Sequence, residues 1–359
     1  MAEKLMRKGI KDIPPYIPGK SKKEIAQEYG LDEDSIIKLG SNENPLGPSK
    51  KVIDVITEYA DEVSIYPADI PKELHSKIAE YVGVDESQVI AGNGSDEILD
   101  MAVKMFVEQG DEAVIHVPTF SMYRKLVELY SGKCVYVPLG DGFKFDADKI
   151  LEQITERTKL VFVCSPNNPT GSTISEEGLR KILDRNAMVI LDEAYVEFSS
   201  ESFVQLVNEY KNLIILRTFS KAFGLAGLRV GYGIADSEII EYMLRIKIPF
   251  SVNALAQKAA IAALEDKEYL KKSVELVKEG RVFVIDEISK IKGARAYPSE
   301  ANFVFVELDA KSEDIVRSLQ KRGIIVRDCG FAGLENHIRV SIGTMEENVR
   351  FLENLREVL

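Results

Sequence analysis

The amino-acid sequence predicts an α/β protein, with a large domain built on a mainly parallel sheet covered by helices and a smaller α+β domain. Three observations predict this. The chain has 359 residues, more than one compact core usually carries. Helical and strand-like patterns alternate through its middle. Its C-terminal third instead has one long helical pattern followed by strands. We assign residues 1–40 to an N-terminal arm that joins the small domain, 41–247 to the large ligand-binding domain and 248–359 to the small domain.

The expected elements follow in chain order. Residues 1–39 are charged and contain several prolines, so we expect an irregular arm. Amphipathic stretches predict helices, and short apolar runs bounded by turn residues predict strands. In the large domain the helices are expected at 49–62, 71–83 and 95–109, and the strands at 113–117, 134–137, 160–164, 188–191, 213–216 and 230–234. In the small domain a helical pattern over 252–292 precedes strands at 302–308, 323–326 and 337–342, with helices between and after them.

Composition excludes several classes of protein. The formal net charge of −12 argues against binding to nucleic acid, which needs a basic surface. No apolar run is long enough to cross a membrane, and the polar N-terminus lacks the apolar segment of a signal peptide. The three cysteines and three histidines show neither disulfide nor metal-ligand spacing. We therefore expect a cytoplasmic protein that has no metal site and binds no membrane.

Polar side chains follow three of the predicted strands. Asn168 comes after 160–164, Asp192 with Tyr195 after 188–191, and Lys221 after 213–216. Ligands of open α/β sheets bind beyond the carboxyl ends of the strands, so these side chains should meet at one place. Taken singly, the Asn fits a turn, the Asp a helix N-cap and the Lys a solvated surface. Their joint occurrence in this order favours a ligand site.

A glycine-rich segment offers a place for an anion. Gly94, Ser95 and Asp96 open the predicted helix at 95–109, where unpaired N–H groups can bind an anion and the glycine lets the backbone approach it. An N-cap by Ser95 or Asp96 is the structural alternative. The segment matches neither common nucleotide-binding pattern. Arg229, eight residues beyond Lys221, suits the same anion.

Together these segments resemble fold-type I enzymes that depend on pyridoxal 5′-phosphate, and among them the histidinol-phosphate aminotransferases. The resemblance covers nearly the whole chain. It is carried by LGSNENP from residue 39, YP from 66, GNGSDE from 92, PTFSMY from 118, SPNNPTG from 165, DEAY from 192, the stretch from Thr218 to Gly231, and IRVSIGT from 338.

The resemblance implies roles around the cofactor. Lys221 would form the Schiff base with pyridoxal 5′-phosphate, and Asp192 would pair with its pyridine nitrogen. Asn168 and Tyr195 would bond to its phenolic oxygen. Phe120 would stack on the ring, where relatives often have a tyrosine. The phosphate would be held by Gly94, Ser95, Asp96, Thr218, Ser220 and Arg229, and across a homodimer interface by Tyr66 of the partner subunit.

The resemblance also implies the reaction. The amino group of L-histidinol phosphate would pass to 2-oxoglutarate, giving imidazole acetol phosphate and glutamate in histidine biosynthesis. Arg327 and Arg339 would bind the phosphate and carboxylates of the two substrates, Tyr16 would close over them and Asn42 would line the pocket. From the residues alone, Arg339 inside an apolar run indicates either an anionic ligand or an internal salt bridge, and Arg327 is equally well an ordinary strand-end charge.

Three alternatives stay open. An aromatic amino-acid aminotransferase and a threonine-phosphate decarboxylase share the fold, and an arginine pair does not distinguish a phosphate from a carboxylate. A third alternative, of a different class, is a non-catalytic effector-binding domain of a transcription regulator. The short arm leaves too little chain before the large domain for a DNA-binding segment, and the intact set of Asp192, Tyr195 and Lys221 favours an enzyme.

Overall fold

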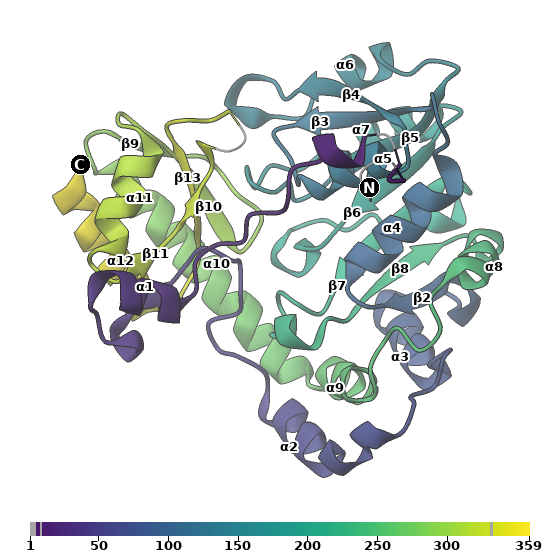
Figure 1. The fold of residues 1–359 in the computed structure, drawn as a ribbon, viewed down its shortest axis with the longest axis horizontal. Coiled ribbons are helices and arrows are strands. Elements are labelled where there is room, and N and C mark those ends of the chain that lie inside the picture. Colours follow the sequence, from purple (N-terminus) through teal and green to yellow (C-terminus); the bar gives the residue numbers. More distant parts are fainter. Residues whose placement is uncertain (1–4, 8, 331–332) are drawn as a thin grey trace.

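A computed structural model describes residues 5–7, 9–330 and 333–359, and Figure 1 shows its arrangement. Its largest sheet has seven strands in the order β2-β8-β7-β6-β5-β3-β4. Of these seven, β8 is antiparallel to both of its neighbours and the other pairs are parallel. The prediction of a mainly parallel sheet is confirmed. The strands are β2 (Val89–Gly92), β3 (Glu112–Val117), β4 (Lys133–Pro138), β5 (Thr158–Cys164), β6 (Met188–Asp192), β7 (Leu213–Thr218) and β8 (Gly231–Ala235).

Helices cover both faces of this sheet because successive strand residues point to opposite sides. On β5, Val161 and Val163 pack in the cluster that includes α2 (Lys50–Glu58), α3 (Lys72–Val82), α7 (Glu176–Leu183) and α9 (Ala254–Glu265). Phe162 packs on the other face, with α4 (Ser95–Phe106), α5 (Met122–Leu129) and α8 (Ser237–Ile246). By the same alternation Asp192, at the end of β6, lies on the side of α4 and α5.

A second sheet has four strands in the order β12-β13-β10-β9. They are β9 (Ala294–Ala296), β10 (Phe303–Leu308), β12 (Arg327–Asp328) and β13 (His337–Ser341), packed with α10 (Lys267–Ser289), α11 (Ser312–Gln320) and α12 (Met345–Val358). Antiparallel pairing sets Arg327 opposite Arg339. The boundary assigned at residues 247 and 248 remains a prediction, since α9 lies beyond it yet packs on α2 and α3.

The N-terminal segment crosses between the two parts of the molecule. Figure 1 shows it, in purple, running from α1 beside the four-stranded sheet toward β3 and α5. β1 (Ile37–Lys38) pairs in parallel with β11 (Ile324–Ile325). The Arg327 side chain donates to the Ile17 carbonyl at 2.9 Å, and the ring of Tyr16 lies under Lys125 Nζ of α5 at 5.6 Å. The arm thus passes over the carboxyl ends of the central strands. No helix of the described residues has the length and apolar character needed to span a lipid bilayer.

Two expected elements were wrong, and a third is shorter than expected. The arm is not irregular throughout: it contains α1 (Lys22–Tyr29), which begins with a capping box of Ser21 and Glu24 and buries Ile25. The helical pattern over 252–292 is two helices, because Asp266 ends α9 and its side chain caps α10 through the Tyr269 N–H. The strand expected at 323–326 is shortened to β11, and the chain continues into a separate strand, β12, which belongs to the other sheet.

Candidate functional site

A cavity of about 450 Å³ opens at the carboxyl ends of β5, β6 and β7. Its size is typical of sites for small molecules. It brings together every predicted site residue except Tyr66, although they come from segments far apart in the sequence. The predicted residues that line it are Tyr16, Asn42, Gly94, Ser95, Asp96, Phe120, Asn168, Asp192, Tyr195, Thr218, Ser220, Lys221, Arg229, Arg327 and Arg339.

Asp192 is a buried carboxylate with two fixed donors. The Ala194 N–H donates to Oδ1 at 3.0 Å and the Tyr123 hydroxyl donates to Oδ2 at 2.6 Å. Burial raises the pKa of Asp192 to about 6, and these two hydrogen bonds act in the opposite direction. No role for Tyr123 follows from the sequence pattern. Tyr123 is the second residue of α5 and Phe120 precedes that helix, and their rings meet edge-on at 5.6 Å.

Lys221 lies close to Tyr195. Its Nζ is 5.7 Å from the centre of the Tyr195 ring, and the Tyr195 hydroxyl accepts from Asn42 Nδ2 at 3.0 Å. Burial, and then the positive charge of Arg339, lower the pKa of Lys221 to about 8. A larger share of its amine is therefore uncharged near neutral pH than in an ordinary lysine, as a nucleophile or base requires.

The start of α4 forms an anion-binding end of the cavity. Gly94 has a φ of 76°, and a Cβ there would lie 2.9 Å from Arg229 Nη2. Asp96 holds the Arg229 side chain through an ion pair of 3.0 Å. A side chain on Gly231 would collide with the Ser95 amide. These glycines keep the helix N-terminus, a guanidinium and nearby hydroxyl groups together, which suits a phosphate group.

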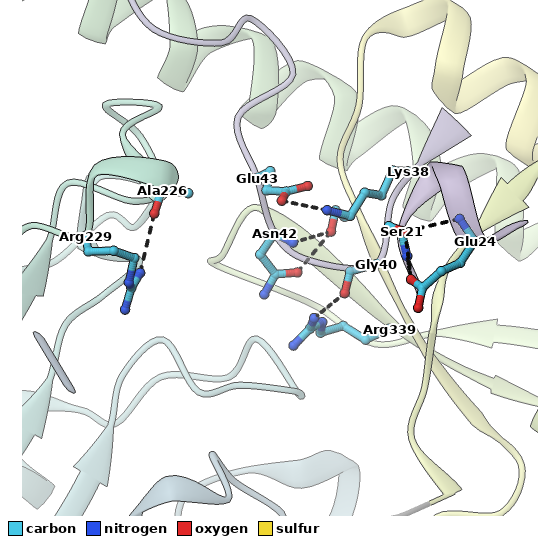
Figure 2. A network of polar contacts seen from close by, with 10 residues as sticks. Ser21, Glu24, Lys38, Gly40, Asn42, Glu43, Ala226, Arg229 and Arg339 are labelled. Atoms are coloured by element: carbon cyan, nitrogen blue, oxygen red, sulfur yellow. Dashed lines mark hydrogen bonds and ion pairs between the residues drawn. The ribbon is translucent and has the colours of Figure 1, made fainter. Parts of the chain in front are cut away.

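Arg339 is buried beside the arm. Its Nη1 donates to Asn168 Oδ1 at 2.6 Å. Its Nη2 donates to the Gly40 carbonyl at 2.8 Å, as Figure 2 shows. Its Nε is buried without a hydrogen-bond partner. Among the described residues no carboxylate lies within 4.0 Å of Arg339, so the alternative of an internal salt bridge does not occur there. A buried cation without a counter-charge favours an anionic ligand.

Tyr66 lies outside the cavity of its own chain. Its side chain is 82% exposed, and its ring is 4.9 Å from that of Phe250. A single subunit therefore does not bring Tyr66 to the site, and its predicted role depends on a second subunit.

Comparison with known proteins agrees with this geometry. The family model for class I and II aminotransferases matches residues 34–355. The chain is 43% identical to the histidinol-phosphate aminotransferase of Methanocaldococcus jannaschii, over 100% of this chain and 99% of the relative. It is 46% identical to the one of Methanosarcina barkeri, over 96% of this chain and 94% of that relative. This chain belongs to the histidinol-phosphate aminotransferase family.

The histidinol-phosphate aminotransferase of Sinorhizobium meliloti, solved in complex with pyridoxal 5′-phosphate, has the same fold. The two chains superpose with a TM-score of 0.90 at 27% identity, over 98% of this chain and 97% of the other. Histidinol-phosphate aminotransferases are transaminases that depend on pyridoxal 5′-phosphate. The predicted fold type, enzyme class and cofactor are thereby confirmed.

The residues present in this member of the histidinol-phosphate aminotransferase family fit that cofactor. A phosphate group matches the N–H groups of α4 and the Arg229 guanidinium, and an aldehyde matches the Lys221 amine. A basic pyridine nitrogen matches the buried Asp192 carboxylate, whose oxygens each keep a lone pair beyond the bonds described above. Phe120 offers an aromatic face.

Proposed function

We propose that this chain transfers the amino group of L-histidinol phosphate to 2-oxoglutarate, giving imidazole acetol phosphate and glutamate, a step of histidine biosynthesis. The observation that supports this best is the pair of arginines, Arg327 and Arg339, opposite each other on β12 and β13 in the cavity that also contains Lys221. Two guanidiniums can bind a phosphate in one half-reaction and carboxylates in the other. The names of the relatives at 43% and 46% identity support the same substrate.

When bound, pyridoxal 5′-phosphate supplies an aldehyde that accepts the amino group and a ring that acts as an electron sink. Lys221 would hold the cofactor through its Nζ, and the same Nζ would move a proton, as base and then as acid. Its lowered pKa of about 8 suits both tasks. Asp192 is proposed to hold the proton on the ring nitrogen. Asn168 and Tyr195 are proposed to donate to the phenolic oxygen from the sides of β5 and β6.

The remaining predicted residues have proposed roles in binding. Gly94, Ser95, Asp96, Thr218, Ser220 and Arg229 would hold the cofactor phosphate, directly or, for Asp96, by orienting Arg229. Phe120 would stack on the ring. Tyr16 and Asn42, from the segment that crosses the cavity, would cover the substrate and line its pocket.

We also propose that the protein is a cytoplasmic homodimer with composite sites. Exposed apolar side chains lie near Tyr66 in the sequence, namely Val63, Ile65 and Ile70, and others lie on the segment whose Phe250 ring contacts it, namely Ile248 and Phe250. A patch of this kind is typical of a surface covered by another subunit. In a two-fold dimer each loop would reach the other subunit's site.

The substrate is tested by comparing amine donors. With 2-oxoglutarate as acceptor, we expect kcat/KM for histidinol phosphate to exceed that for phenylalanine or tyrosine by about a hundredfold or more, since only the first carries a phosphate for the arginines. Carbon dioxide release from threonine phosphate would indicate the decarboxylase instead. A preference for phenylalanine over histidinol phosphate would contradict the proposal.

Arg339→Ala is expected to lower kcat/KM by about a hundredfold or more for both histidinol phosphate and 2-oxoglutarate, because it removes the buried counter-charge for both anions. Arg295→Ala, at an exposed position of β9 in the same sheet, is the matched control and should keep wild-type values. Histidinol without the phosphate should be a poor substrate of the wild type and should lose little further in Arg339→Ala. An equal loss with histidinol and histidinol phosphate would assign Arg339 a structural role.

A further inference from the structure

Tyr123 lies directly behind the cavity, in the first turn of α5. Its side chain is 1% exposed, and its ring stacks on that of Phe162 at 4.9 Å with an interplanar angle of 14°. Its other side meets Phe120 edge-on, at 5.6 Å and 84°. Both aromatic neighbours hold the ring in one orientation, so the position of the hydroxyl is determined by packing.

The Tyr123 hydroxyl forms a hydrogen bond with the Asp192 carboxylate. The Oη to Oδ2 distance is 2.6 Å, which is typical of an O–H group bonded to a charged oxygen. Burial, together with the neighbouring carboxylate, raises the pKa of Tyr123 well above its usual value. The hydroxyl therefore keeps its proton and is the donor in this bond.

Asp192 needs such donors because burial disfavours its charged form. Its other fixed donor is the Ala194 amide. The charged groups that face it have opposite effects: Asp96 of α4 raises the pKa of Asp192, and Lys221 after β7 lowers it. Cys164 at the end of β5 and Tyr195 after β6 face it as neutral groups, because burial raises the pKa of both. The bond from Tyr123 opposes burial more strongly than any of the others.

We propose that Tyr123 is a positioning residue of the reaction, whose hydroxyl keeps the Asp192 carboxylate ionised and turned toward the ring nitrogen of the cofactor. The proposal rests on the proposed role of Asp192. Through its edge contact the same side chain also fixes Phe120, so that one residue orients both the carboxylate at the ring nitrogen and the aromatic ring at the cofactor face.

The test compares two Tyr→Phe variants of the loaded enzyme. Tyr123→Phe removes the hydroxyl and keeps the ring contacts. Tyr130→Phe is the matched control, because Tyr130 at the other end of α5 also donates to an aspartate, Asp100 at 3.0 Å, away from the cavity. The enzymes are loaded with pyridoxal 5′-phosphate labelled with ¹⁵N in the ring, and the ¹⁵N chemical shift reports protonation of that nitrogen.

At neutral pH we expect the ¹⁵N shift of Tyr123→Phe to move toward that of unprotonated pyridine, since a carboxylate with fewer donors takes a larger share of the proton. We expect kcat to fall roughly tenfold, as for loss of one hydrogen bond to a charged group, with a smaller change in KM. Tyr130→Phe should keep the wild-type shift and kcat. If Tyr123→Phe keeps the wild-type shift, with or without a lower melting temperature, the proposal is overturned.

A double-mutant cycle separates this proposal from the role of Asp192 itself. Asp192→Asn alone should leave the ring nitrogen unprotonated, and adding Tyr123→Phe should then change neither the shift nor kcat further. A ring nitrogen that stays protonated in Asp192→Asn would disprove the role of Asp192. A large additional loss of kcat in the double variant would show that Tyr123 acts independently of Asp192 and would overturn the positioning role alone.

Discussion

Lys221→Ala is expected to lower turnover by about 10⁴-fold or more, because one amine serves as both the nucleophile and the proton carrier. The fold should survive, since the Lys221 side chain lines the cavity and belongs to none of the apolar clusters. The variant should still bind pyridoxal 5′-phosphate without a covalent bond, through Asp192 and the donors at the start of α4. Steady-state kinetics, circular dichroism and cofactor titration measure the three expectations.

The covalent attachment is checked by borohydride reduction of the loaded wild type, followed by peptide mapping. The cofactor should remain on the peptide that contains Lys221. Lys258→Ala is a matched control: Lys258 Nζ also lies over a tyrosine ring, that of Tyr59 at 5.1 Å, but outside the cavity. It should keep wild-type turnover and labelling. Label recovered on a different lysine would contradict the assignment.

Much of the candidate site could be predicted because it depends on two regular features. Strand residues alternate between faces, and parallel strands end at a common edge of the sheet, so polar residues after three consecutive strand patterns must meet. Asn168, Asp192 and Lys221 follow this rule. Ser95 lies at the same edge for another reason: α4 begins directly after β2, which runs in the same direction as β7, so the N-terminus of α4 lies at the carboxyl end of that strand.

The partners of these residues could not be predicted in the same way. Tyr123 and Asp192 are 69 positions apart, and their contact depends on how closely α5 packs on the sheet. The bond from Arg339 to the Gly40 carbonyl joins residues 299 positions apart. No local pattern of charge or hydrophobicity encodes either distance, so the sequence indicates which groups surround the ligand but not which groups orient them.

The predicted helix boundaries were wrong where a single side chain ends a helix inside a periodic apolar pattern. The apolar periodicity of 252–292 passes through Asp266, but that side chain caps the following helix and the chain turns there. The direction of β8 could not be predicted from its apolar run either, because such a run has the same composition whether the strand is parallel or antiparallel to its neighbour. The glycine-rich segment before β8 brings the chain back antiparallel beside β7.

The role of Tyr66 cannot be derived from one chain, and subunit mixing tests it directly. Tyr66→Ala should be impaired if each site uses Tyr66 of the partner subunit, and Lys221→Ala should be inactive. A heterodimer of the two variants then has one site with both defects and one site with neither. Mixed in equal amounts with free exchange, about half of the dimers are heterodimers, each with one intact site. The mixture should therefore recover activity to about a quarter of that of the wild type, although neither parent is fully active.

Tyr242→Ala, at an exposed tyrosine of α8, is the control for Tyr66→Ala and should keep full activity by itself. Size-exclusion chromatography with differently tagged subunits verifies that heterodimers form. If Tyr66 served its own subunit instead, every heterodimer would contain one site without Tyr66 and one without Lys221. Activity would then stay at the average of the two parents. The two arrangements differ only in which subunit supplies the tyrosine, so recovery above that average, in verified heterodimers, is the result that places Tyr66 across the interface.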